Sequence, residues 1–341
     1  VCVLPATADD GPADAMSLSK GFHIPLVDLS QDTDRHVIVA AGTDAVYQGH
    51  PTTVLLPDGK TMLAVWTYGH GGVCGPMKKS TDGGKTWGEL LPVPESWREV
   101  RNCPAIYRLI DPQGKARLFV FAMHAGGLVS SCSEDDGASW TEMQPIEGLN
   151  LTKGVMPWCT ITPIEGGKRL LAATNARRAN DPDRYSNNVV QSVSGDGGLT
   201  WGPVRVICDL PGYKPCEPCF IRSPDGRQLL CLMRENVRTV NSRFIVSQDE
   251  GQTWSKPKYL PGSLTGDRHQ AKVCGTGVAG CSNTQLPGIN NDEYSYDGYV
   301  FSVRVKQKVA GQPLLFQVYD PAFAYVGDKC ETNIATYPTA A

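Results

Sequence analysis

Short apolar runs alternate with polar turns along most of the chain. The runs TMLAVW at 61–66 and RQLLCLM at 227–233 have the length of β-strands. Similar runs follow the four turn signals PDGK at 57–60, PQGK at 112–115, EGGK at 165–168 and PDGR at 224–227. Glycine in such a turn allows a tight reversal between two strands. The pattern therefore predicts an all-β chain built of hairpins.

A second signal, Ser-x-Asp-x-Gly-x-(Thr/Ser)-Trp, occurs four times, at 80–87, 133–140, 194–201 and 247–254. Its aspartate can accept hydrogen bonds from backbone N–H groups just ahead of it, its glycine supplies a left-handed position, and its tryptophan covers the turn with a large ring. We interpret the four aspartates as structural staples of hairpins. They are Asp82, Asp135, Asp196 and Asp249.

The spacing of these boxes predicts the architecture. The aspartates are 53, 61 and 53 residues apart, which is typical of radially repeated β units with one four-stranded blade in each interval. Pro51, Pro104, Pro157 and Pro218 begin apolar runs and precede the aspartates by 31, 31, 39 and 31 residues. The third unit therefore carries an insertion, which we place at 175–185. We expect a β-propeller.

Composition narrows the functional classes. The 341 residues include 36 Gly and 25 Pro, and a net charge of −3 with mixed signs offers no basic stripe for nucleic acid. No apolar run has membrane-spanning length, and no His and carboxylate cluster has metal-ligand spacing, so we expect neither metal nor cofactor. Among the 12 cysteines, Cys274, Cys281 and Cys330 suit a disulfide of an exported protein. We expect a periplasmic or extracellular location, with the signal sequence not present in this chain.

The topology of a blade also indicates where a site would lie. The box is on the turn between strands three and four, so the residues just before strand one and just after strand two meet at the opposite end. This end is richer in Arg, Glu and His than folding requires, and we expect it to be the active face; solvated charged loops are the alternative. Before the first strands stand Gly49, His50, Arg98, Glu99, Arg101, Asn102, Val155, Met156, Cys216, Glu217, Asp267, Arg268 and His269, and after the second strands Tyr68, His70, His124, Asn175, Arg177, Arg178, Arg234, Glu235 and Asn236.

The boxes and the stretches GHPTTVLLPDGKTM, CEPCFIRSPDGRQLLCLMREN and LPGSLTGDRH carry a family likeness. Over residues 23–272 the chain resembles the bacterial sialidase (neuraminidase) family of Asp-box, or BNR-repeat, propellers. The resemblance implies a six-bladed sialidase-like β-propeller, of which four Asp-box units are clear. Residues 1–22 then form a lead outside the repeat, and 273–341 a divergent β-rich C-terminal segment, without a box, that we expect to complete the propeller.

The resemblance also implies an activity, that of an exo-acting glycoside hydrolase releasing terminal sialic acid from glycoconjugates without a cofactor. The sialidases that this chain resembles bind the sugar carboxylate with three arginines. They use a Tyr nucleophile paired with a Glu, and an Asp as acid/base. Candidate substrate-binding residues here are Arg234, Arg268, Arg101, Arg98 and His269. Candidate catalytic residues are Glu217, Glu235, Asp267 and His50.

Two departures from the family keep other functions open. The family's first blade commonly starts Tyr-Arg-Ile-Pro, whereas this chain reads YQGHP, with His50 in place of a cation. The nucleophile of the family lies late in the chain, where several tyrosines are available and no local motif selects one. The alternatives are a propeller hydrolase or lyase acting on another acidic polysaccharide, and a non-catalytic glycan-binding propeller. The available tyrosines are Tyr294, Tyr296, Tyr299, Tyr319 and Tyr325.

Overall fold

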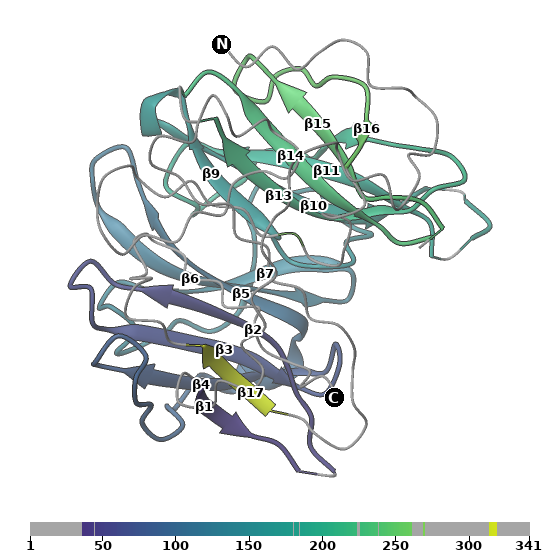
Figure 1. Ribbon diagram of the computed structural model, residues 1–341. Coiled ribbons are helices and arrows are strands. Elements are labelled where there is room, and N and C mark those ends of the chain that lie inside the picture. The colour runs from purple at the N-terminus through teal and green to yellow at the C-terminus, as the bar shows by residue number, and fades with distance from the viewer. Residues whose placement is uncertain are drawn as a thin grey trace, which may run out of the picture.

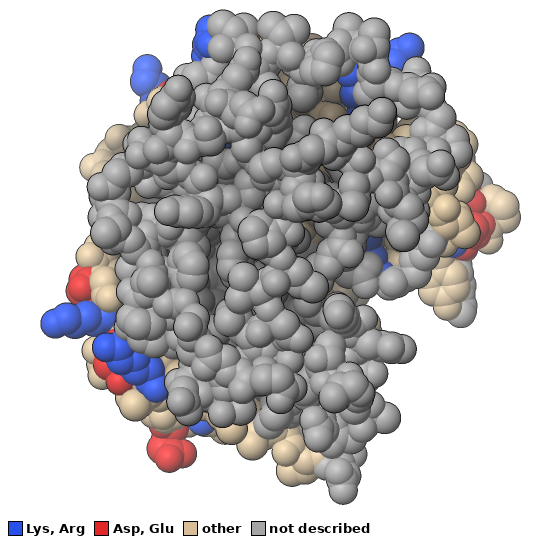
Figure 2. Space-filling view, in the orientation of Figure 1, with Lys and Arg blue, Asp and Glu red and all other residues tan. Residues whose placement is uncertain are grey.

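A computed structural model describes residues 36–43, 45–179, 181–183, 185–223, 226–237, 239–260, 269 and 314–318, the last range as backbone only. Its strands follow one another as antiparallel hairpins and form stacked sheets (Figure 1). In the view of Figure 2, described charged side chains of both signs lie around the margin of the molecule. Among the described residues, no helix has the length and apolar character needed to cross a membrane.

The first two blades are joined into one seven-stranded sheet by a single pair between Val73 and Arg101. The first blade gains an outer bridge between Lys78 and Leu90. A short 3-10 helix, η2 (Glu95–Glu99), leads from one blade to the next. The strands are β2 (Gln48–Leu55), β3 (Met62–Tyr68) and β4 (Val73–Ser80) in the first blade, and β5 (Arg101–Ile110), β6 (Ala116–His124), β7 (Gly127–Ser133) and β8 (Gln144–Pro145) in the second.

The third and fourth blades are separate four-stranded sheets, each with its strands in meander order. A one-turn 3-10 helix, η3 (Glu165–Gly167), makes the first turn of the third blade. The strands are β9 (Thr160–Ile164), β10 (Arg169–Arg177), β11 (Asn187–Ser194) and β12 (Arg205–Cys208), then β13 (Pro215–Arg222), β14 (Leu229–Glu235), β15 (Arg243–Ser247) and β16 (Lys258–Tyr259). The wide interval between β10 and β11 confirms the predicted place of the insertion.

All four boxes have the same geometry. Each aspartate accepts a hydrogen bond at Oδ1 from the serine hydroxyl two residues earlier, at 2.8 Å, and at Oδ2 from the Thr or Ser hydroxyl four residues later, at 2.5–2.6 Å. The backbone N–H of that later residue also donates to Oδ1, at 2.8–3.0 Å. These bonds favour the ionised carboxylate and lower the pKa of Asp82 and Asp135 to about 2. Each box ties the third strand of its blade to the fourth.

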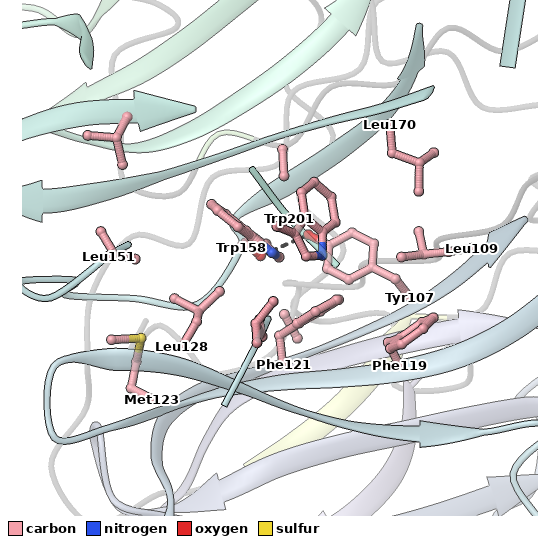
Figure 3. Packing of buried hydrophobic residues seen from close by; sticks show 14 of the residues in the cluster. Tyr107, Leu109, Phe119, Phe121, Met123, Leu128, Leu151, Trp158, Leu170 and Trp201 are labelled. Atoms are coloured by element: carbon pink, nitrogen blue, oxygen red, sulfur yellow. Dashed lines mark hydrogen bonds between the residues drawn. The ribbon is translucent and has the colours of Figure 1, made fainter. Parts of the chain in front are cut away.

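Apolar layers hold successive blades together. The layer between the second and third blades contains Tyr107, Phe121, Trp158 and Trp201, whose rings face one another in Figure 3. The Trp158 and Trp201 centroids are 5.1 Å apart, and the buried Tyr107 hydroxyl donates to the Trp158 carbonyl at 2.9 Å. Burial of one such side chain stabilises the fold by about 1.5–3 kcal/mol. Equivalent layers join the first blade to the second and the third to the fourth.

A two-stranded sheet lies beside the first blade. Its strands are β1 (His36–Ala41) and β17 (Leu314–Val318), which pair antiparallel although they are far apart in the sequence (Figure 1). Val39 of β1 is buried against Ala64 and Trp66 of β3. One strand of the C-terminal segment thus lies next to the first repeat; the proposed boundary at residue 273 falls outside the described residues.

The prolines differ from their predicted place. Pro51, Pro104 and Pro218 lie within β2, β5 and β13 instead of at their beginnings. Each of these strands has a register shift against the second strand of its blade at the proline. Proline cannot donate to a ladder, so a bulge accommodates it and lets the strand continue past it. The residues predicted just before the first strands are therefore mostly their first residues.

Candidate functional site

The first residues of the first strand and the last residues of the second strand lie at one end of each blade, opposite the box. Antiparallel pairing places Cys216 beside Arg234 in the fourth blade and Arg101 beside Met123 in the second. We call this end of the four blades the site end. The structure thus places several predicted residues, among them Arg101, Cys216 and Arg234, at this end of their blades.

Four non-glycine residues of the first strands have a left-handed backbone at the site end: Asn102, with φ of 66°, and the three residues that precede prolines. His50, Cys103 and Glu217 each precede a proline and have φ of 49°, 48° and 51°. A non-glycine residue in this left-handed region costs about 1–3 kcal/mol and persists where its surroundings hold it. At each bulge the strand changes the direction of its side chains. The observed conformation therefore presents His50 and Glu217 differently from residues of a regular strand.

Hydrogen bonds connect the four blades across the site end. The Asn102 backbone N–H of the second blade donates to the Gly72 carbonyl of the first, and the Asn102 side-chain amide donates to the Val155 carbonyl of the third. Val155 N–H donates to the Asn175 carbonyl, and the Asn175 side chain accepts from the Glu217 N–H of the fourth blade at 3.3 Å. Two asparagines thus fix the spacing between neighbouring blades at this end.

The fourth blade contributes an ion pair between Glu217 and Arg234 to the site end. Nη1 of Arg234 lies 3.1 Å from both carboxylate oxygens of Glu217, and Nη2 donates to the Asn236 side chain at 2.8 Å. The side chains of Arg234 and Glu217 are 14% and 13% exposed, so the pair is mostly buried and still reaches solvent. Cys216, next to it, is buried, and burial raises the pKa of its thiol. The two residues predicted for carboxylate binding and catalysis are in direct contact.

Glu235 is in a different environment from Glu217, the other glutamate among the catalytic candidates. Its side chain is fully buried, and its Oε2 lies 3.1 Å from Nε of Arg243. Its Oε1 accepts the Lys214 backbone N–H at 2.7 Å. These contacts are those of a group that orients its neighbours; the catalytic role of Glu235 stays a prediction.

Sequence reasoning missed Arg243. Its guanidinium lies 4.4 Å from the ring centroid of Tyr213 and 4.2 Å from that of Tyr259, and it donates to the Tyr259 hydroxyl at 3.0 Å. Cation–π contacts of this kind are strong where water is excluded. The available signal was an arginine beginning the apolar run RFIVS, where a buried carboxylate partner is needed.

The first blade places two histidines together at the site end. The ring centroids of His50 and His70 are 4.5 Å apart in an edge-on arrangement. Nδ1 of His50 accepts the Gly71 backbone N–H at 3.2 Å, so its neutral form carries the ring proton on Nε2. His50 is therefore a fixed side chain of this blade, with Nε2–H as a hydrogen-bond donor.

The remaining predicted residues are less closely associated. Arg101 begins β5 at the site end and Arg98 lies on η2; both are exposed. His269 is partly buried, whereas Asp267 and Arg268 lie outside the described residues, as do all five late tyrosines. Within the described part of the chain, no group of three or more His, Cys, Asp or Glu side chains is arranged to hold a metal ion.

Comparisons with known proteins bear on the fold and on the sequence. No family model matches the chain. A curated sialidase from Micromonospora viridifaciens is 28% identical over 212 residues, which cover 54% of this chain and 30% of the sialidase. The chain thus spans under a third of that relative's length.

Solved structures resemble the fold. A protein of unknown function from Dyadobacter fermentans DSM 18053 superposes with a TM-score of 0.53 at 15% identity, covering 66% of this chain and 72% of that one. The NanB sialidase from Streptococcus pneumoniae gives a TM-score of 0.46 at 13% identity, covering 69% and 55%. The fold class is an all-β, sialidase-like β-propeller. In sequence, about half of the chain is similar to a sialidase.

Proposed function

We propose that the protein is an exo-acting glycoside hydrolase of sialidase type, which releases a terminal acidic sugar, sialic acid, from glycoconjugates. The observation that carries the proposal is the partly exposed Glu217–Arg234 pair at the site end. An arginine presents a planar fork of donors that matches a carboxylate, and a neighbouring carboxylate holds the fork in orientation. The sequence likeness to a curated sialidase supports the same function.

The proposed roles follow from the geometry and from the resemblance. Arg234 binds the sugar carboxylate, and Arg101 and Arg268 complete the grip. Glu217 sets the orientation of Arg234 and takes part in proton transfer with the group that attacks the sugar. Asp267 is the proposed acid/base. Arg98 and His269 are proposed substrate contacts around this centre.

The substrate carboxylate would approach a guanidinium that already pairs with a carboxylate. Arginine has five N–H donors in a fixed plane, so one guanidinium can bind two acceptors along different edges. Asn236 holds Nη2 at 2.8 Å and Asn175 holds the Glu217 backbone, so both members of the pair are fixed before the ligand arrives. Preorganised donors of this kind strengthen binding because little order is lost on association.

Hydrolysis of 4-methylumbelliferyl α-sialoside by the purified chain tests the proposal. We expect turnover by the wild type and its loss in Glu217→Gln and Arg234→Lys, because the first removes a charge and the second replaces the planar fork. The matched control is Glu165→Gln, which alters an exposed Glu–Arg pair at the box end of the third blade. Equal turnover in all four proteins, or none in a folded wild type, contradicts the proposal.

The His50–His70 contact favours a second candidate, a propeller hydrolase or lyase acting on another acidic polysaccharide. At this place the family has an arginine, and an imidazole can transfer a proton where an arginine cannot. Under this alternative His50→Ala abolishes cleavage of a polyuronate, whereas under the first proposal it only weakens sialoside binding. A panel of uronic-acid polysaccharides assayed beside the sialoside separates the two. Retention of glycans on an array without cleavage would instead indicate the non-catalytic propeller.

A further inference from the structure

The insertion of the third blade folds onto the fourth blade instead of extending away from it. Arg178, just after β10, donates from Nε to the Asp209 carboxylate and from Nη2 to the Leu210 carbonyl. Asp183 forms an ion pair with Lys214 at 2.6 Å, which lowers the pKa of the aspartate. Both contacts hold the loop against the segment that leads from β12 into β13.

The loop also has internal order. The Asp183 carboxylate accepts the Tyr185 backbone N–H at 2.8 Å, and the Asp183 carbonyl accepts the Ser186 N–H at 2.9 Å. Asp183 itself donates its N–H to Asp181 at 2.8 Å. One aspartate therefore fixes the turn before Tyr185 and, through Lys214, fixes that turn to the fourth blade.

Tyr185 is the aromatic side chain that this arrangement presents. Its ring is flanked by Arg177 at 5.5 Å and Lys214 at 6.0 Å, measured from each cationic centre to the ring centroid. The residue is 50% exposed. The loop thus holds an exposed aromatic ring in a positively charged setting.

The segments beside this ring are connected to the proposed catalytic centre. Arg177 is two residues after Asn175, whose side chain contacts Glu217. Lys214 donates its backbone N–H to Glu235 and accepts that of Asn236, the two residues after Arg234. Lys214 thus directly precedes β13, which carries Glu217, and Arg177 ends β10, whose Asn175 contacts Glu217.

We propose that Tyr185 is a subsite for a second sugar of an acidic glycan, the sugar next to the one bound at Glu217–Arg234. The ring offers an apolar face for the C–H groups of a pyranose, and Arg177 and Lys214 favour a glycan with negative charge nearby. The inference rests on the proposed function. It assigns the insertion of the third blade to recognition of the glycan beyond its terminal residue.

Titration calorimetry with methyl α-sialoside and with sialyllactose tests this assignment; every protein compared, including the one with wild-type Tyr185, carries Asp267→Asn so that the ligands are not hydrolysed. We expect the wild type to bind the trisaccharide more tightly, and Tyr185→Ala to lose roughly three- to tenfold of affinity for the trisaccharide while its affinity for the methyl glycoside stays unchanged. Tyr185→Phe keeps the ring and is expected to behave as the wild type. Leu199→Ala, which truncates an exposed apolar side chain in the box of the same blade, is the matched control.

The outcomes separate the subsite from the site. Equal affinity of the wild type for both ligands, or a Tyr185→Ala variant that loses both equally, overturns the subsite and leaves the terminal-sugar site in place. A folded wild type that binds neither ligand overturns the proposed function and the subsite with it. Retained trisaccharide affinity in Tyr185→Ala also overturns the assignment.

Discussion

Two Glu–Arg pairs meet in one strand of the fourth blade, and they differ in almost every physical respect. Arg234 and Glu235 are neighbours in β14, so their side chains leave the strand on opposite faces. Arg234 pairs with Glu217 in a setting where both side chains are 13–14% exposed. Glu235 pairs with Arg243 where the exposed fractions are 0% and 7%.

The difference shows how one strand can brace a site and form it. The Glu235–Arg243 pair, called here the closed pair, spans β14 and β15. Two tyrosine rings flank its arginine, so the pair fixes the end of β14. The Glu217–Arg234 pair, called here the open pair, uses the neighbouring residue of β14. The closed pair therefore fixes the part of the strand that carries Arg234. Buried pairs are often no better for stability than apolar residues, but they are costly to break. We infer that the closed pair positions Arg234 and that the open pair binds the glycan.

Breaking the closed pair should have the largest effect on folding. Arg243→Ala leaves the Glu235 carboxylate buried without its cation, which is expected to lower the free energy of unfolding by about 3–5 kcal/mol. Urea unfolding followed by tryptophan fluorescence measures the loss. A loss below about 1 kcal/mol would show that water reaches Glu235 and that the two pairs are alike.

Breaking the open pair should affect function far more than folding. Arg234→Ala is expected to lower kcat/KM on the sialoside roughly 100-fold, because the carboxylate grip is removed. Its free energy of unfolding should fall by less than in Arg243→Ala, since Glu217 is less completely buried than Glu235. Steady-state kinetics and urea unfolding on the same samples provide both numbers. Destabilisation as large as that of Arg243→Ala would remove the distinction.

Replacing both members of the closed pair sharpens the comparison. Glu235→Leu with Arg243→Met leaves no buried charge and should recover most of the stability lost in Arg243→Ala. If the pair positions Arg234, the double variant still has a raised KM although it is stable. Normal kinetics in a stable double variant would limit the pair to a folding role.

The smallest expected effect is the loss of folding stability in acid. Because of it, the two pairs should be compared near neutral pH. The folded pKa of Asp82 is lowered from 3.8 to about 2, so its contribution to stability is present above about pH 4 and is lost as the pH falls towards 2. The stability difference between wild type and Asp82→Asn should therefore be smaller at pH 3 than at pH 7. A difference that does not change with pH would contradict this origin.

The repeat and its turns could be predicted because they depend on local chemistry. The box needs its Ser, Asp, Gly and Trp within eight positions, and its hydrogen bonds are those expected of such a turn. The site end followed from the order of the strands in a blade, whereas the contact between Glu217 and Arg234 was not predicted. The box aspartates and the insertion could thus be read from spacing alone.

The closed pair and the subsite ring could not be predicted in this way. Arg243 finds Glu235 across two strands and two tyrosines of other segments, and such a partner is not visible in one strand's pattern. Tyr185 acquires its place through Asp183 and Lys214, which come from different blades. The predictions for Asp267 and Arg268 stay predictions, because both lie outside the described residues.

At the left-handed positions before the three prolines, the residue that favours thermal stability differs from the residue that favours ligand binding. Glycine adopts φ near +50° without the penalty that Glu217 bears, so Glu217→Gly would relax the backbone while deleting the carboxylate. A variant library selected only for heat resistance would therefore be expected to drift to glycine or asparagine at residue 217. A library selected for glycan binding should keep the strained glutamate.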